Sequence, residues 1–348
     1  MGLCACIAAA VGAAGAVGGL ARARELLRRA ESHAQKTRVH ALERSLSLKE
    51  AHDGGIGANL EGSVAAGQYR ISRRMGAGAT GVIYEAVRIS DGLPVAIKLL
   101  RVAAAHDAVA SDRLRREAEA LGLAWHPNVV EVIDHGHLPD GTAYLVMELL
   151  PGESLATRLR NRGRLTPREL LPIALQMCDA LAAVHAAGVV HRDVKPSNIL
   201  LAVDRDDPAG PERVKLLDFG IARVEWEETR ITNTGGPLGT PGYMSPEQEM
   251  GEGEVDGRSD LFALGAMLYE CLVGEPPPPR SPSGLMRTDG SSQRTDSGTQ
   301  RSSSLLPPPW RVIIERAMSP LPSDRYPDAR AFGQALRNIP QELSEALP

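Results

Sequence analysis

Residues 71–89 read "ISRRMGAGATGVIYEAVRI" and combine three glycines with a run of strand-forming residues. It holds Gly76, Gly78 and Gly81 in G-x-G-x-x-G spacing, which brings a backbone close to phosphate in several unrelated folds. In a dinucleotide-binding unit such a turn leads from a strand directly into a helix. Here the residues after Gly81 are β-branched or aromatic in alternation, which predicts a strand. The glycines are therefore predicted to form the tip of a hairpin that can lie over a triphosphate.

Composition and charge place the chain among ordinary globular proteins. It has 348 residues, 43% hydrophobic and 24% charged, with a net charge of -4. Since nucleic-acid-binding proteins carry a basic patch or stripe, this balance predicts no nucleic-acid partner. The four cysteines form neither a disulfide framework nor a C-x-x-C metal pair, which predicts a reducing, cytoplasmic compartment.

The first 67 residues are predicted to precede the globular unit. Residues 1–20 are an apolar extension dominated by Ala and Gly, and two interpretations stay open: a weakly helical extension, or a membrane tether. Residues 21–67 combine a segment of helical composition with a linker, "HDGGIGANLEGSVAAG", at 52–67.

The remainder divides into a β-rich part and a helical part, an α+β arrangement. Residues 68–150 show short strand-like runs and one amphipathic helix at 109–124. Residues 151–340 are mostly helical and are followed by a tail at 341–348. The clearest predicted helices are 154–162, 167–187, 258–273 and 310–319. Residues 276–309, rich in Ser and Pro, are predicted to be a disordered insertion because they can bury little apolar surface.

Four further motifs follow the glycines in a fixed order. They are "VAIK" ending at Lys98, "HRDVKPSN" at 191–198, "DFG" at 218–220 and "GTPGYMSPE" at 239–247. With this set the chain resembles the eukaryotic-like serine/threonine protein kinase family, as found in bacteria, over residues 68–340. The resemblance implies a two-lobed fold, with a β-rich N-lobe (68–150) containing one helix and a mainly α-helical C-lobe (151–340).

The resemblance also implies a set of catalytic roles. Lys98 is expected to reach the α- and β-phosphates of ATP and to pair with Glu117. Asp193 is expected to accept a hydrogen bond from the substrate hydroxyl, and Lys195 to neutralise the γ-phosphate. Asn198 and Asp218 are expected to hold Mg²⁺, with Mn²⁺ as an alternative, because hard cations prefer oxygen ligands.

The expected nucleotide pocket lies between the lobes. Adenine is expected between Val82 and Ala96 above and Leu200 below, with Met147 as the gatekeeper. The hinge is expected at Glu148-Leu149-Leu150, and its backbone groups are expected to bind adenine, so that the identity of its side chains matters little. The full set is Met75, Gly76, Ala77, Gly78, Ala79, Thr80, Gly81, Val82, Ala96, Lys98, Met147, Glu148, Leu149, Leu150 and Leu200.

Other residues are expected to support or regulate the site. His191 is expected to be a buried structural residue. Arg192 before the catalytic Asp implies control by phosphorylation of the loop 218–247, whose candidate threonines are Thr232, Thr234 and Thr240. Glu247 is expected to form a buried ion pair with Arg325. The family's "APE" motif is "SPE" here, which places Ser245 where relatives have Ala.

These observations lead to two hypotheses of different classes. The first is an active Ser/Thr protein kinase, with protein substrates and autophosphorylation, for which dimerisation is one route. The alternative is a nucleotide-binding pseudokinase that acts as a scaffold. The first is favoured because Lys98, Asp193, Asn198 and Asp218 are all present.

Overall fold

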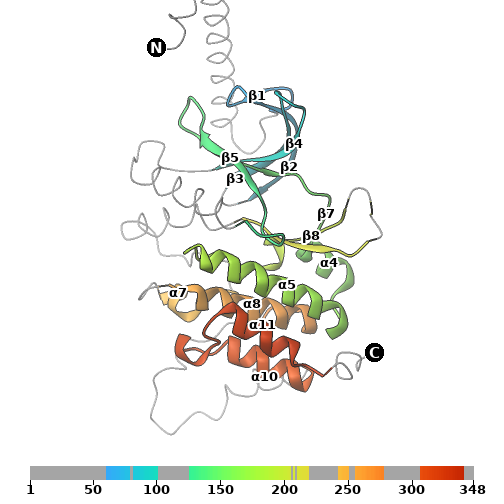
Figure 1. Ribbon diagram of the computed structural model, residues 1–348, viewed down its shortest axis with the longest axis vertical. Helices are drawn as coiled ribbons and strands as arrows, with labels where there is room; N and C mark the ends of the chain where they lie inside the picture. The colour runs from blue at the N-terminus through green and yellow to red at the C-terminus, as the bar shows by residue number, and fades with distance from the viewer. Residues whose placement is uncertain are drawn as a thin grey trace, which may run out of the picture.

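The computed structural model shows two lobes, a curled sheet and a stack of helices (Figure 1). It describes residues 60–78, 81–100, 125–204, 207, 210–218, 242–250, 255–277 and 306–340. The sheet lies at the top of Figure 1 and the helices beneath it, with strands β7 and β8 between the two.

The N-lobe is a six-stranded sheet in the order β1-β2-β3-β4-β6-β5, and its neighbouring strands all pair antiparallel. Its strands are β1 (Val64–Ala65), β2 (Tyr69–Gly78), β3 (Gly81–Arg88), β4 (Pro94–Leu100), β5 (Val132–His137) and β6 (Ala143–Glu148). The predicted hairpin at the glycines is confirmed, because β2 and β3 pair through to Gly78 and Gly81. The helix predicted at 109–124 lies outside the described residues.

Gly81 is required by the sheet itself. It pairs with Leu100 and has a φ of 157°, and a Cβ at this position would collide with the carbonyl oxygen of Leu99. A Cβ on Gly76, in contrast, would meet no atom within 4 Å. The third glycine of the motif therefore allows β3 to pair closely with β4, whereas the first leaves the space above the hairpin open.

The N-lobe begins earlier than predicted. The assignment of 52–67 to a linker is wrong for residues 60–67, because β1 pairs with β2 and Leu60 and Ala65 are buried. The backbone N–H of Gly62 also donates to the carbonyl oxygen of Ile71, at 2.9 Å. Short apolar residues among glycines look like a linker in sequence, and only the partner strand shows that they are part of a sheet.

Backbone hydrogen bonds join the two lobes beside the hinge. A second sheet contains β7 (Gly152–Ser154), β8 (Ile199–Ala202) and β9 (Arg213–Leu216) in that order. Leu216 of β9 donates its N–H to Asn128 at 2.8 Å and accepts one from Val130 at 3.0 Å. The side-chain amide of Asn128 donates to the carbonyl oxygen of Val214, at 2.8 Å. The segment that leads into β5 is therefore attached to the strand that leads to Asp218.

The C-lobe is built around α8, most of whose residues are buried and which contacts α5, α10 and α11. Its helices are α4 (Leu155–Arg162), α5 (Pro167–Ala186), α7 (Pro246–Met250), α8 (Gly257–Val273), α10 (Pro308–Ala317) and α11 (Ala329–Arg337), with 3-10 turns η1 (Pro196–Asn198) and η4 (Pro322–Asp324). The four helices predicted most clearly from the sequence correspond to α4, α5, α8 and α10. By length and composition α5 could cross a membrane, but many of its residues are buried in the core of this lobe.

Capping residues fix where these helices begin. Ser154 and Asp256 accept hydrogen bonds from the first turns of α4 and α8. Thr166 and Glu169 form a capping box at the start of α5. Because β7 runs directly into the Ser154 cap, the chain that leaves the hinge enters α4 without a loop.

The insertion ends earlier than predicted. Residues 306–309 were expected to belong to the disordered segment 276–309, but Leu306 is only 2% exposed and α10 begins at Pro308. Proline is favourable in the first turn of a helix, where its missing N–H needs no partner. The Pro-rich composition therefore concealed a helix start, while residues 278–305 lie outside the described part of the chain.

Candidate active site

Lys98 lies in the middle of β4, opposite Ile83 on one side and Leu145 on the other. Its side chain is 6% exposed, and its Nζ lies 2.8 Å from Oδ1 of Asp218. A buried ammonium group needs a charged partner, and the aspartate supplies it. The expected partner Glu117 lies outside the described residues, so its pairing with Lys98 stays a prediction.

Asp193, Lys195 and Asn198 lie together on residues 191–198, the segment before β8 that is called the catalytic loop below. The Nζ of Lys195 lies 3.0 Å from Oδ2 of Asp193. The Asn198 amide nitrogen donates to the carbonyl oxygen of Asp193 at 2.8 Å and to its Oδ2 at 3.1 Å. These bonds turn the amide nitrogen of Asn198 toward Asp193 and leave its Oδ1 as the acceptor.

A backbone hydrogen bond holds this loop beside the end of the strand that leads to Asp218. The backbone N–H of Leu217 donates to the carbonyl oxygen of Asn198 at 2.8 Å, because β8 and β9 are neighbours in the sheet. Asp218 follows with a φ of 51°, in the left-handed region. Lys98, Asp218, Asn198 and Asp193 are thus connected by a continuous chain of contacts from the N-lobe to the catalytic loop.

His191 is a structural residue, as predicted. It is fully buried, its Nε2 donates to the carbonyl oxygen of Leu217 at 2.8 Å, and its Nδ1 accepts from the N–H of Asp193 at 3.2 Å. Burial lowers the pKa of His191, so the ring is neutral, and these two contacts define its tautomer. The ring ties the catalytic loop to the residue that precedes Asp218.

Asp260 in α8 holds the backbone of the same loop. Its carboxylate accepts the N–H of His191 at 2.8 Å and of Arg192 at 2.7 Å, and it also contacts Nε2 of His185 at 2.8 Å. No role for Asp260 was predicted from the sequence. The available signal was a carboxylate inside the apolar run "DLFALGAML", where burial is costly unless every oxygen has a partner.

The side chain of Glu148 joins the lobes at the hinge. Its Oε1 accepts from Nζ of Lys215 at 2.5 Å and from the backbone N–H of Glu131 at 2.9 Å. Lys215 also donates to the carbonyl oxygen of Val129, at 3.3 Å. The side chain of Glu148 therefore has a structural role that was not predicted from the sequence, an ion pair that crosses from β6 to β9.

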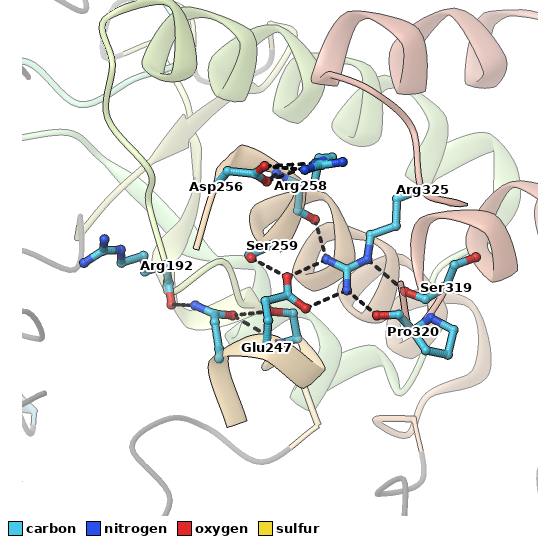
Figure 2. Close-up of polar contacts among 10 residues, drawn as sticks. Arg192, Glu247, Asp256, Arg258, Ser259, Ser319, Pro320 and Arg325 are labelled. Carbon is cyan, nitrogen blue, oxygen red and sulfur yellow. Dashed lines mark hydrogen bonds and ion pairs between the residues drawn. The ribbon is translucent and has the colours of Figure 1, made fainter. Parts of the chain in front are cut away.

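Glu247 and Arg325 form the predicted buried ion pair (Figure 2). The contacts are bidentate, with Nη1 at 2.6 Å and Nη2 at 2.7 Å from the two carboxylate oxygens. Arg325 donates further to the carbonyl oxygens of Arg258, Ser319 and Pro320. Burial alone would raise the pKa of Glu247, but the hydrogen bonds from Arg325 and Ser259 lower it to about 2. This network attaches α7 to the turn before α11.

Comparison with known proteins agrees with this geometry. The sequence-family model described as "Protein kinase domain" matches residues 69–330 of the chain. The chain belongs to the protein kinase family. It is a serine/threonine protein kinase of the eukaryotic-like type found in bacteria.

The proteins that the chain resembles include two bacterial serine/threonine-protein kinases and one solved bacterial kinase domain. The chain is 36% identical over 293 residues to serine/threonine-protein kinase PknL of Mycobacterium tuberculosis, covering 83% of this chain and 69% of PknL. It is 34% identical over 285 residues to pkn3 of Myxococcus xanthus, covering 81% of this chain and 51% of pkn3. The Mycobacterium tuberculosis PknI kinase domain superposes with a TM-score of 0.61 at 28% identity, covering 80% of this chain and 98% of that domain.

The strand register of this kinase corrects one expected adenine contact. Residues directly opposite in neighbouring strands share a face, so Ile83 lies on the face of Lys98, which also carries Ala96. Val82 lies opposite Leu99 and packs against the N-lobe core. The assignment of Val82 to the adenine pocket is therefore wrong, and Ile83 is the β3 residue on the pocket side. The sequence signal was available, since alternation fixes one face once Lys98 is placed.

The other residues predicted for the nucleotide pocket lie on β2, β3, β4, β6 and β8, directly after β6, or outside the described residues. Met147 is buried opposite Ala96, and Glu148 ends β6 before Leu149. Leu200 is half-buried and pairs with Lys215, so it lies on the face of β8 opposite the buried Leu201. Met75, Gly76, Ala77 and Gly78 belong to β2. Ala79, Thr80, Thr232, Thr234 and Thr240 lie outside the described residues.

Protein kinases use ATP and Mg²⁺, and the donor set fits the metal. Within the described ranges, no group of three or more His, Cys, Asp and Glu side chains could hold a metal ion. Asp218 and Asn198 offer one carboxylate and one amide oxygen, which suits a cation that keeps several waters and binds the substrate phosphates. The bonds from the Asn198 nitrogen to Asp193 leave its oxygen as the atom that could bind such a cation.

Proposed function

We propose that this kinase transfers the γ-phosphoryl group of ATP to serine or threonine hydroxyls of proteins, with Asp193 as the residue that orients the hydroxyl. The observation that carries the proposal is the connected chain Lys98–Asp218, Asn198–Asp193 and Asp193–Lys195. Phosphoryl transfer needs positioned charge more than covalent chemistry, and this chain combines two ammonium groups with two carboxylates.

In the proposed reaction a bond forms between the substrate oxygen and the γ-phosphorus. The bond from the γ-phosphorus to the oxygen it shares with the β-phosphate breaks, and ADP leaves. The carboxylate of Asp193 accepts the hydrogen bond of the attacking hydroxyl and takes its proton as the new bond forms. Mg²⁺ bound by Asp218 and Asn198 would neutralise phosphate charge.

Each lysine has a separate part in this scheme. Lys98 holds the α- and β-phosphates from the N-lobe, and its ion pair with Asp218 fixes its direction. Lys195 is close to Asp193 and offers its ammonium to the γ-phosphate, where negative charge remains throughout transfer. The residues that bind adenine are proposed as Ile83 and Ala96 above, Leu200 below, and the backbone of 148–150 beside it.

The proposal extends to regulation and location. Thr232 and Thr234 are proposed as sites of autophosphorylation, with Arg192 as the partner of the phosphate and Thr240 as a contact of the catalytic loop. Encounter of two chains is one route to this modification. A cytoplasmic location is proposed, and tethering through residues 1–20 remains a separate hypothesis.

The test is phosphate transfer from labelled ATP with Mg²⁺, followed by mapping of the modified residues. Wild type is expected to incorporate phosphate on Ser or Thr, whereas Asp193→Asn and Lys98→Met are expected to lose activity by about 100-fold or more. Binding of a fluorescent ATP analogue by Asp193→Asn controls for folding. A wild type that binds nucleotide without transferring phosphate would refute the proposal and favour the scaffold alternative.

A further inference from the structure

The peptide unit between Arg192 and Asp193 is held at both of its polar ends. Its N–H, which belongs to Asp193, donates to Nδ1 of His191 at 3.2 Å. Its carbonyl oxygen, which belongs to Arg192, accepts from Nε2 of Gln248 at 3.3 Å. Arg192 itself has a φ of 63°, a left-handed conformation that a bulky side chain adopts only where surrounding contacts hold it. His191 in the same loop and Gln248 in α7 therefore fix the orientation of the peptide plane from which Asp193 extends.

The amide of Gln248 is itself fixed by Ser245. Its Oε1 accepts from the backbone N–H of Ser245 at 3.2 Å and from the Ser245 hydroxyl at 3.1 Å. Because both partners donate, the oxygen must face Ser245 and the nitrogen must face Arg192. Ser245 is fully buried. The serine of the "SPE" motif thus orients the amide that reaches the catalytic loop.

The helix that carries Gln248, α7, is itself held by a buried ion pair. Gln248 follows Glu247 in α7, and the bidentate pair of Glu247 with Arg325 anchors the helix to the C-lobe (Figure 2). The Ser259 hydroxyl donates to the same carboxylate, at 2.5 Å. A displacement of α7 would therefore move the Gln248 amide away from Arg192.

We propose that Gln248, oriented by Ser245, is a positioning residue for phosphoryl transfer that holds the carbonyl of Arg192 and so sets the direction of the Asp193 carboxylate. It acts through the backbone and touches no reacting atom. This inference rests on the proposed function, and its test below separates the two.

Three variants and one control isolate the contact. Gln248→Glu keeps an acceptor for Ser245 but turns an oxygen toward the Arg192 carbonyl. Gln248→Met removes both contacts at similar volume, and Ser245→Ala removes only the hydroxyl bond. Gln334→Met is the matched control, because Gln334 is exposed on α11 and its side chain bonds only Asn338 among the described residues.

The first readout is steady-state kinetics per nucleotide-binding site. Gln248→Glu and Gln248→Met are expected to lower kcat about three- to tenfold, with Gln248→Glu the lower and the KM for ATP unchanged. Ser245→Ala is expected to fall between these and wild type, and Gln334→Met to match wild type. A loss of thermal stability with kcat per site unchanged would overturn the proposal, because it would show a structural role only.

The second readout does not depend on catalysis. Hydrogen–deuterium exchange of peptides covering 189–198 is expected to be faster in both Gln248 variants than in wild type and Gln334→Met. If wild type transfers no phosphate, the proposed function fails and this exchange still decides the positioning role. Unchanged exchange in the catalytic loop would overturn it.

Discussion

The buried pair of Glu247 and Arg325 allows a quantitative prediction for Glu247→Gln. The glutamine keeps one acceptor oxygen but places an NH₂ group against the guanidinium, whose side chain is 0% exposed. Removing one partner of a buried ion pair costs about 3–5 kcal/mol. The lowered pKa gives a similar figure, since a shift from 4.5 to about 2 corresponds to about 3 kcal/mol. Arg325 keeps its bonds to three carbonyl groups, so we expect the lower end, about 3 kcal/mol.

The assay is guanidinium unfolding of wild type and Glu247→Gln at several pH values. The pKa of Glu247 is depressed in the folded state, so its ionised carboxylate contributes its full stabilisation above the unfolded pKa of 4.5. This contribution is lost as the pH falls toward about 2. The difference between the two proteins should therefore be constant from about pH 7 to 5 and shrink below about 4.5. In thermal unfolding it should appear as a fall in Tm of about 6–12 °C.

Arg337→Gln is the matched control in the same lobe. The pair of Arg337 with Asp179 is 46% and 49% exposed, so its loss should cost less than about 1 kcal/mol. The reasoning would be refuted if Glu247→Gln destabilised no more than this control. A difference that varied between about pH 7 and 5 would also contradict it, because Glu247 would then not be the titrating group.

Two further pairs of substitutions test the pocket and the hinge. Ile83→Ala should raise the KM for ATP about three- to tenfold, whereas Val82→Ala should instead lower the free energy of unfolding by about 0.5–1.5 kcal/mol. Steady-state kinetics and denaturant unfolding of both variants check this, and the opposite pattern would show that the β3 register is misjudged. Lys215→Met should lower the free energy of unfolding by about 1–3 kcal/mol by removing the cation beside Glu148, while Arg213→Met, exposed on the same strand, should have little effect in the same denaturant titration. Equal stability of the two β9 variants would show that the ion pair across the hinge contributes nothing.

Local sequence patterns were sufficient for most of the fold. The alternation after Gly81 predicted a hairpin, and the ordered motifs at Lys98, 191–198 and 218–220 placed the two lobes around a common site. Those patterns worked because each depends on neighbours in sequence: strand alternation, helix periodicity and turn residues. The errors at 60–67 and 306–309 arose where a short segment folds only against a distant partner.

The residues proposed to be catalytic were readable from their motifs, but the residues that hold them in place were not. Asp260, Lys215 and Gln248 are far in sequence from the groups they hold, and a lone Asp, Lys or Gln carries no local signature. Val82 and Ile83 show the same dependence on distant segments. Both follow the glycine motif directly, and only the register of β3 with β4 shows which of them lies on the face of Lys98.

The sequence alone therefore determined the family, the lobe order and the types of group at the reaction centre, because these follow from short motifs and periodic burial. The tertiary structure decided which atoms meet. It paired Lys98 with Asp218, directed the Asn198 oxygen away from Asp193, and brought Gln248 to the carbonyl of Arg192. Hydrogen bonds and ion pairs act over only a few ångströms, so these contacts exist only once packing has brought distant segments together.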